Sequence, residues 1–430
     1  FRATYSYKDT YLVEGNLGYT GSENFNKERR YGWFPSISGG WVPTQYDWYR
    51  NLLPFNNFLK FRASWGRVGN DRLKDENGND IRFPYLTTLG NVSSTWGTGL
   101  AENRTGSMNL KWEVSTKTNF GIDARFFDDK VDMTVDFFHT KTTDIFQRRA
   151  NIPDEGGLSN VLPYANIGSM KSWGMDGTLA YTHTFNKDMA LTVRGNFTHA
   201  ENEVIYWEQS GVNYPYQSNS GVPYKVQRGL IALGLFKDED DIKSSPKQTF
   251  MDNYRPGDIK YKDVNGDGKI DKDDVVPLNY SAVPFIQYGF ALDWNYKAFR
   301  VSILFEGVSK VQYFQGGRGF YPFLNESRGN LLEMVADPRN RWIPREYAEV
   351  NGIDPALAEN PNAKFPRLTY GENKNNNQES TFWLADGKYL RLKNVDVSYR
   401  FTNNWLKSRV GVESATLSLI GEDLHVWDKV

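Results

Sequence analysis

The stretch IQYGFALDWNYKAFRVSILFEGV, residues 286–308, decides the fold class, because apolar and polar residues alternate along it. Successive side chains of a β-strand point to opposite faces of the sheet, so a period of two sorts these residues into two faces. One face carries Tyr288, Phe290, Leu292, Trp294 and Tyr296 and, after a turn at Lys297-Ala298, Phe299, Val301, Ile303 and Phe305. The other face carries Gly289, Ala291, Asp293, Asn295, Arg300, Ser302 and Glu306, with Leu304 as the apolar exception. The stretch predicts a β-hairpin with one apolar face.

The same pattern recurs along the chain. TNFGIDARFFDDKVDMTVDFFHT (118–140) turns at 127–130, GTLAYTHTFNKDMALTVRGNFTHA (177–200) turns at 186–188, and a first hairpin turns at Lys8-Asp9. Further strands are expected at 59–65, 395–401 and 415–419. The two strands of the 286–308 hairpin have about nine residues each, which is the length that a tilted strand needs to cross a bilayer.

The connections alternate in length as well. Short turns close the hairpins, whereas long polar segments, roughly 66–112, 140–172, 200–284 and 307–387, join one hairpin to the next. Short turns at one end and long extracellular loops at the other are typical of outer-membrane barrels. The sequence therefore predicts an all-β protein, a transmembrane antiparallel β-barrel with residues 1–430 as barrel and loops.

The composition of the 430 residues agrees with this fold. Aromatic residues make up 15% of the chain, yet the mean hydropathy is −0.62 and no apolar run approaches the length of about 18 residues that a membrane helix needs. In a barrel strand, apolar residues that face lipid alternate with polar residues that face inward, so the mean hydropathy of the strand is low. Only the alternation, and not the mean hydropathy, indicates that such a strand inserts into a membrane. The net charge of −1 gives no basic excess for nucleic acid, and the absence of cysteine excludes disulfides and thiol catalysis.

Two other classes of protein remain open at this point. A calcium-stabilised surface protein that binds glycans or mediates adhesion would bury the alternating faces in a soluble β fold. A β-rich glycoside hydrolase would require a pair of carboxylates at a fixed separation, and no pair stands out among the many acids of the chain. We therefore predict no catalytic residue.

The segment DVNGDGKIDKDD, residues 263–274, has the spacing of a calcium-binding loop. Calcium prefers oxygen ligands, and Gly268 would permit the sharp turn at position 6 of such a loop. Ile270 would anchor the loop to its neighbours. The predicted ligands of a structural Ca²⁺ are the side chains of Asp263, Asn265, Asp267, Asp271 and Asp274 and the backbone carbonyl of Lys269. A solvated turn is the alternative.

Two loop segments concentrate aromatic residues. YWEQSGVNYPYQ (206–217) contains Tyr206, Trp207, Tyr214 and Tyr216, and QYFQGGRGFYPF (312–323) contains Tyr313, Phe314, Phe320 and Tyr321. Aromatic faces stack on sugar rings, so either cluster could contact substrate. The favoured alternative is that these residues belong to interfacial aromatic girdles or pack within their own loop. The sequence leaves the substrate-binding residues unassigned.

Several separated stretches resemble the SusC family of TonB-dependent outer-membrane transporters, in the order in which that family has them. They are WFPSISGGW (33–41), LKFRASWGRVGND (59–71), GLIALGLFKDEDDI (229–242), PGDIKYKDVNGDGKIDKDD (256–274), NRWIP (340–344) and DGKYLRLKNVDVSYRF (386–401). The final segment SLIGEDLHVWDKV resembles a late strand of the family, in which Asn more often precedes the Leu and a Phe follows it. The resemblance extends over essentially the whole chain.

The resemblance implies part of a 22-stranded barrel in the outer membrane of a Gram-negative cell. It further implies import of oligosaccharides or peptides, with a SusD-like lipoprotein as a lid and TonB acting through a plug domain. No signal peptide, TonB box or plug domain is found in these residues, and Phe1 already lies in a predicted strand. We therefore expect the chain to be an internal, C-terminal barrel portion of a longer polypeptide.

Overall fold

A computed structural model describes residues 1–75, 78–95, 97–153, 161–324, 331–402, 407–408 and 411–429. Twelve strands form one sheet, and every strand pairs in antiparallel fashion with its neighbour, in chain order. They are β1 (Arg2–Tyr7), β2 (Tyr11–Gly21), β3 (Tyr31–Trp41), β4 (Asn56–Asn70), β9 (Glu113–Phe126), β10 (Val131–Arg148), β11 (Tyr164–Asn186), β12 (Met189–Tyr206), β19 (Ile286–Tyr296), β20 (Phe299–Ser309), β23 (Tyr389–Phe401) and β24 (Ala415–Asp428). The predicted all-β antiparallel fold is confirmed.

The register of the β19–β20 hairpin follows from its alternation. Phe290 lies opposite Phe305, and their rings stack with centroids 4.5 Å apart. On the other face Asp293 lies opposite Ser302. A slip of one residue would exchange the two faces, so the apolar pattern specifies this pairing.

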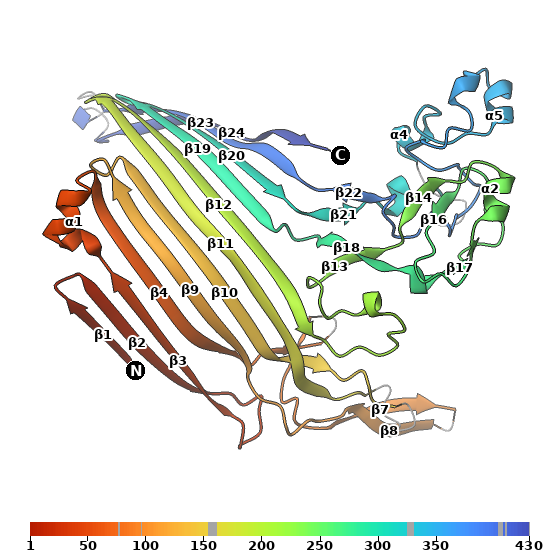
Figure 1. Ribbon diagram of the computed structural model, residues 1–430, viewed down its shortest axis with the longest axis horizontal. Coiled ribbons are helices and arrows are strands. Elements are labelled where there is room, and N and C mark those ends of the chain that lie inside the picture. Colours follow the sequence, from red (N-terminus) through yellow and green to blue (C-terminus); the bar gives the residue numbers. More distant parts are fainter. Residues whose placement is uncertain are drawn as a thin grey trace.

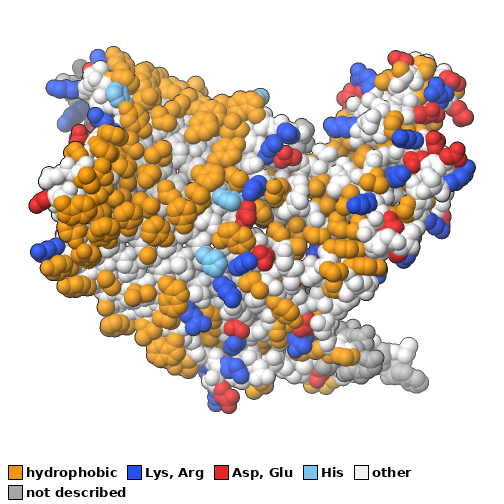
Figure 2. Space-filling model, in the orientation of Figure 1, with side chains coloured by type: hydrophobic (Ala, Val, Ile, Leu, Met, Phe, Trp, Pro, Cys, Tyr) orange, Lys and Arg blue, Asp and Glu red, His pale blue; other side chains and the backbone are white. Residues whose placement is uncertain are grey.

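The apolar face of the sheet is exposed. Large side chains on it, such as Trp33, Leu179 and Phe290, are 60%, 53% and 39% exposed. Figure 2 shows apolar side chains spread as a broad area over the strands, while charged side chains gather over the loops. The twelve-stranded sheet is the only large one among the described residues, and the others are two-stranded, so no second sheet covers this face. A soluble sandwich with a buried face is therefore disfavoured.

The short turns lie at one end of the sheet and the long loops at the other (Figure 1). The turn between β9 and β10 uses positive φ at Phe127, Asp128 and Asp129, and Lys297 has φ of 52° in the β19–β20 turn. The β3–β4 connection at the same end carries η1 (Pro43–Gln45) and α1 (Asp47–Leu52), which the sequence did not predict. The sheet is curved (Figure 1). It is also open, because within the described residues β1 and β24 do not pair with each other.

Several strands extend further than the sequence predicted. The interval 140–172 was expected to be a loop, but β10 continues to Arg148 and β11 begins at Tyr164. Likewise β12 continues to Tyr206. The prediction was wrong because the apolar alternation stops where polar side chains take over, whereas backbone pairing continues: Lys141 still lies opposite Lys171.

The long connections carry short elements of their own. The β4–β9 connection holds β5 (Leu73–Lys74), β6 (Asp80–Ile81), β7 (Thr88–Ser94) and β8 (Gly97–Arg104). The β12–β19 connection holds η3 (Pro215–Gln217), β13 (Val226–Gly229), β14 (Ala232–Leu235), α2 (Glu239–Ser244), β15 (Lys247–Gln248), β16 (Ile259–Tyr261), β17 (Lys269–Ile270), η4 (Lys272–Asp274) and β18 (Val276–Ser281). The β20–β23 connection holds β21 (Gln312–Phe314), α3 (Gly317–Phe320), α4 (Glu333–Ala336), α5 (Arg345–Val350), η5 (Pro355–Leu357) and β22 (Leu384–Asp386).

Helix is scarce among the described residues, and the helices of the long connections are short. The helix α4, for example, covers only Glu333–Ala336. In the described part of the chain no helix is both long and apolar enough to span a bilayer.

Replacing Phe290 with Arg tests the lipid-facing assignment. We expect a loss of about 2–4 kcal/mol in the free energy of unfolding, because a guanidinium at mid-bilayer depth is poorly solvated. Thermal unfolding of the full-length protein in detergent or lipid measures the loss. Asn196→Arg on the inner face is the matched control, because Asn196 lies opposite Gly289 at the same depth. Equal stability of both variants would contradict the assignment.

Candidate functional site

The described residues of the two longest connections, 207–285, 310–324 and 331–388, fold together as one structure, which we call the loop unit. It shares a buried apolar core formed by Leu230, Leu235, Ile259, Tyr261, Ile270, Tyr321, Val335, Trp342, Ala363, Phe365 and Trp383. Backbone hydrogen bonds join the two connections: the N–H of Leu230 donates to the carbonyl of Glu379, and that of Thr381 donates to Leu230 (both 2.9 Å). Figure 1 shows the loop unit beyond the long-loop end of the sheet.

A buried carboxylate, that of Asp258, fastens the second connection to the first. Asp258 is fully buried, and its Oδ1 accepts hydrogen bonds from the side-chain amides of Asn373 (2.9 Å) and Asn376 (2.8 Å). Its Oδ2 accepts from Arg367 (2.8 Å) and from the backbone N–H of Arg255 (2.7 Å). A buried charge is tolerated only when it is paired and hydrogen-bonded, and this carboxylate has both kinds of partner.

Buried amides extend this network. The side chain of Gln248 donates to Asn375 Oδ1 (2.6 Å) and to the carbonyl of Ile259 (2.9 Å). Asn376 Oδ1 accepts from the N–H of Ile259 (2.9 Å). The asparagines belong to GENKNNN (371–377), which resembles a solvated polar loop in the sequence. Sequence reasoning missed these residues, and the only signal was an unusual run of asparagine.

The predicted calcium loop is a tight turn held by its own side chains. The carboxylate of Asp263 accepts from the N–H groups of Gly266 (2.6 Å) and Gly268 (2.9 Å), and Asn265 Oδ1 accepts from the N–H of Asp267 (3.0 Å). Gly268 has φ of +83°, a left-handed conformation that L side chains rarely adopt. The predicted turn at this glycine is confirmed.

The far end of the loop is anchored in the core. Asp274 is fully buried and accepts from the N–H groups of Val264 (2.7 Å) and Asp271 (2.9 Å). Ile270 is also fully buried in the core of the loop unit, so its predicted anchoring role is confirmed. Lys269 Nζ lies 2.7 Å from Asp271 Oδ2. This hydrogen bond lowers the pKa of Asp271 and raises that of Lys269.

The ligand set of this loop is chemically suited to a hard cation. An ionised carboxylate offers about four acceptor positions, so the N–H bonds leave capacity on Asp263 and Asp274. Among the described residues no three acidic or histidine side chains are gathered as a ready-made metal site. Calcium therefore stays a prediction, and binding it would require Asp267, Asp271 and Asp274 to converge.

Both aromatic clusters make internal contacts. Tyr214 and Tyr216 stack at 5.4 Å, and their hydroxyl groups contact the calcium loop at Asn265 (3.2 Å) and the carbonyl of Asp273 (2.6 Å). In the other cluster Tyr321 is buried against Trp383, with centroids 5.2 Å apart, and Phe314 and Phe320 pack on the same core. Burial raises the pKa of Tyr321 to about 12, so its hydroxyl stays neutral. Tyr206 and Tyr313 are exposed.

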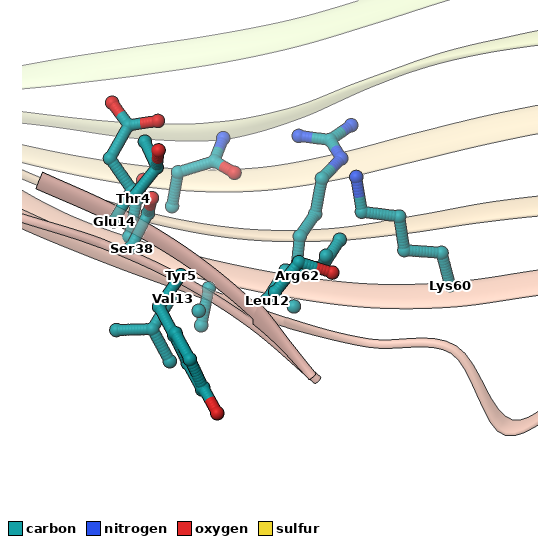
Figure 3. A pocket seen from close by; sticks show the side chains of 14 residues that line it. Thr4, Tyr5, Leu12, Val13, Glu14, Ser38, Lys60 and Arg62 are labelled. Atoms are coloured by element: carbon teal, nitrogen blue, oxygen red, sulfur yellow. The ribbon is translucent and has the colours of Figure 1, made fainter. Parts of the chain in front are cut away.

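The inner face of the sheet is lined with charged and polar side chains. A hollow of about 490 Å³ lies against β1–β4, and Figure 3 shows Glu14, Lys60 and Arg62 on one side of the sheet and Tyr5 and Val13 on the other. Arg62 forms ion pairs with both Asp123 and Asp136 across the neighbouring strands. Because these carboxylates share one guanidinium, they form an ion-pair network on the wall.

The same arrangement recurs at the other side of the sheet. Asp293, the buried polar residue of the opening stretch, binds Arg194 (2.6 Å) and Arg300 (3.0 Å) on the strands beside it. A second hollow of about 500 Å³ lies over β11, β12, β19 and β20. The sheet thus has a lipid-compatible outer face and a charged inner wall, which is the arrangement of an outer-membrane barrel.

The family described as TonB dependent receptor-like, beta-barrel matches residues 1–419. The chain belongs to this family. Its members are receptors of the outer membrane rather than enzymes, so the predicted location and the absence of a catalytic assignment agree with the family. The predicted resemblance to SusC-type barrels is confirmed.

Curated relatives match nearly all of the chain. TonB-dependent receptor P26 of Formosa agariphila is 27% identical over 442 residues, which cover 99% of this chain and 41% of that protein. TonB-dependent receptor SusC of Bacteroides thetaiotaomicron is 23% identical over 419 residues, covering 94% of this chain and 38% of that protein. The chain therefore spans about two fifths of the length of these relatives.

Solved structures share the fold. The RagAB peptide importer in its open-open state aligns with a TM-score of 0.74 at 21% identity, covering all of this chain and 43% of that one. Its closed-closed state aligns with a TM-score of 0.73 at 19% identity, covering all of this chain and 44% of that one. The sheet and the attached loop unit thus form a known arrangement for a partial TonB-dependent receptor barrel.

Replacing Asp258 with Ala tests the role of the buried carboxylate. We expect the loop unit to lose about 3–5 kcal/mol of local stability, because Arg367 is left without its carboxylate partner. Hydrogen exchange of backbone amides in 255–261 and 373–383 of the full-length protein measures the loss. Asp240→Ala is the matched control, because the Asp240 side chain is 91% exposed. Equal protection in both variants would contradict this role.

Proposed function

We propose that the chain forms the barrel wall and outer loops of a SusC/RagA-type transporter that imports oligosaccharides or peptides across the outer membrane. The observation that carries the proposal is the division of one continuous meander into an exposed apolar face and a charged inner wall. A wall of this kind separates lipid from an aqueous or protein-filled lumen. Family membership and the fold shared with the RagAB importer support the same function.

Two partners belong to this proposal. A SusD-like surface lipoprotein would act as a lid over the long-loop end, where the loop unit offers a folded surface. TonB would supply energy through a plug domain and a TonB box. The chain spans about two fifths of the length of its relatives, so their remaining residues are long enough to include such segments. The inner wall, with ion pairs such as Arg194–Asp293, would face the plug. A surface adhesin with the same outer loops is the alternative, and it would bind ligands without importing them.

Deletion of the gene for the full-length polypeptide in its native host tests import. We expect at least tenfold slower uptake of an oligosaccharide or peptide too large for passive porins, and restored uptake with the wild-type gene. Fluorescently labelled substrates of both classes measure uptake, with and without a protonophore. Uptake of a free monosaccharide is the control. Unchanged uptake of every large substrate, with surface binding lost, would favour the adhesin.

We also propose that Ca²⁺ occupies the loop 263–274 and stiffens it. The Asp263→Ala, Asp267→Ala double variant should increase protease cleavage within 256–280, because both carboxylates hold turns of the loop. In the wild-type protein a calcium chelator should have the same effect, and it should add nothing in the variant. Cleavage of the wild type that does not change with chelator would contradict the calcium site.

A further inference from the structure

A cleft of about 840 Å³ in the loop unit has a composition that the proposed function does not explain. Residues 237–239 and 255–256 of the β12–β19 connection form one wall, and residues 341–347 and 367–368 of the β20–β23 connection form the other. The Asp258 network fixes the two walls relative to each other, because Asp258 binds the backbone of Arg255 and the side chain of Arg367. The cleft is therefore built into the fold, and its volume is that of a small-molecule site.

A buried guanidinium lines this cleft without an ionic partner. Arg341 is only 7% exposed, and its Nε donates to the carbonyl of Ala336 (3.2 Å). Its guanidinium lies over the ring of Tyr347 at 5.1 Å. Among the described residues no carboxylate lies within ion-pair distance of it, whereas its neighbour Arg339 pairs with Asp337. The charge of Arg341 also acts on Asp337, whose carboxylate is already paired with Arg339, so the guanidinium of Arg341 keeps the capacity to bind a further anion.

A second donor on the same wall also lacks a partner. Trp342 is 5% exposed, and its buried indole N–H has no hydrogen-bond partner. Gly257 holds the indole in place: its φ is +85°, and a Cβ there would lie 2.3 Å from the ring. The indole nitrogen has less than 1 Å² of accessible surface, so Trp342 shapes this wall of the cleft rather than donating to a ligand in it.

The rim of the cleft carries both signs of charge. Lys237 and Arg255 are exposed cations, and Glu239 and Glu346 are exposed anions. No ion pair within the described residues involves the side chains of these four. A zwitterionic ligand can match both signs of charge, whereas a ligand with a single sign would be repelled by part of this rim.

We propose that the cleft binds a short zwitterionic peptide, with its carboxylate on Arg341 and its ammonium group beside Glu346 or Glu239. A guanidinium binds a carboxylate through two parallel hydrogen bonds, which makes Arg341 the specificity-determining residue. Tyr347, Pro344 and Leu368 supply apolar contacts for the peptide between its charged ends. The inference rests on the proposed function, which has two classes of substrate, oligosaccharides and peptides. It favours peptides.

Calorimetric titration of the full-length protein in detergent with trialanine tests the proposal. We expect Arg341→Met to weaken binding at least tenfold and Arg341→Lys to weaken it less. Arg339→Met should leave binding within twofold of wild type, because Arg339 is exposed and does not line the cleft. The wild-type protein should bind trialanine amide at least tenfold more weakly than it binds trialanine, because the amide lacks the carboxylate. This comparison of ligands needs no variant and holds even if Arg341→Met unfolds.

Two outcomes would overturn the proposal. One is equal binding of trialanine and its amide to the wild-type protein, which would show that Arg341 does not bind the carboxylate of the peptide. The other is Arg341-dependent binding of trigalacturonate without binding of trialanine, which would assign the cleft to an acidic glycan. The titration does not depend on import, so the two proposals can fail separately. Peptide uptake without trialanine binding would contradict only the proposal for the cleft. Trialanine binding without any uptake would contradict only the proposed transport function.

Discussion

Every backbone N–H and C=O group that lies in a bilayer must be hydrogen-bonded within the protein, because hydrocarbon offers no partner. The twelve-stranded meander meets this constraint for the ten strands from β2 to β23, each of which pairs with a neighbour on both sides, whereas among the described residues β1 and β24 pair on one side only. Once pairing is complete, the period of two places one half of the side chains in lipid and the other half on the inner wall. The charged pairs of the wall, such as Asp293 with Arg194 and Arg300, depend on that division.

The loop unit follows a different rule. It lies outside the sheet, so water can satisfy its surface, and it needs an apolar core and buried polar bonds of its own. Asp258 provides the central bonds, because it binds Arg255, Arg367, Asn373 and Asn376 from both connections at once. The predicted calcium loop, residues 263–274, is anchored to the same core through Ile270. The proposed peptide cleft therefore depends on the carboxylate that joins the two loops.

The sequence predicts the strands and turns of this protein better than it predicts the contacts within the loop unit. The hairpin turns, the two faces and the turn at Gly268 were predicted correctly, since each depends on neighbours close in sequence. The extents of β10, β11 and β12 were predicted too short, because pairing continues beyond the last apolar residue. Asn375 and Arg341 were not singled out, because a single polar residue in a long loop carries no periodicity.

By itself the sequence determined the antiparallel sheet and its two faces, because alternation is a local property that any extended strand expresses. Only the tertiary structure decided that the described residues of 207–285 and 310–388 share one core, that Asp258 is buried with four partners, and that Arg341 forms no ion pair with a described residue. These contacts join residues about a hundred positions apart, such as Asp258 and Arg367. They depend on shape and burial after folding, which no pattern along the chain records.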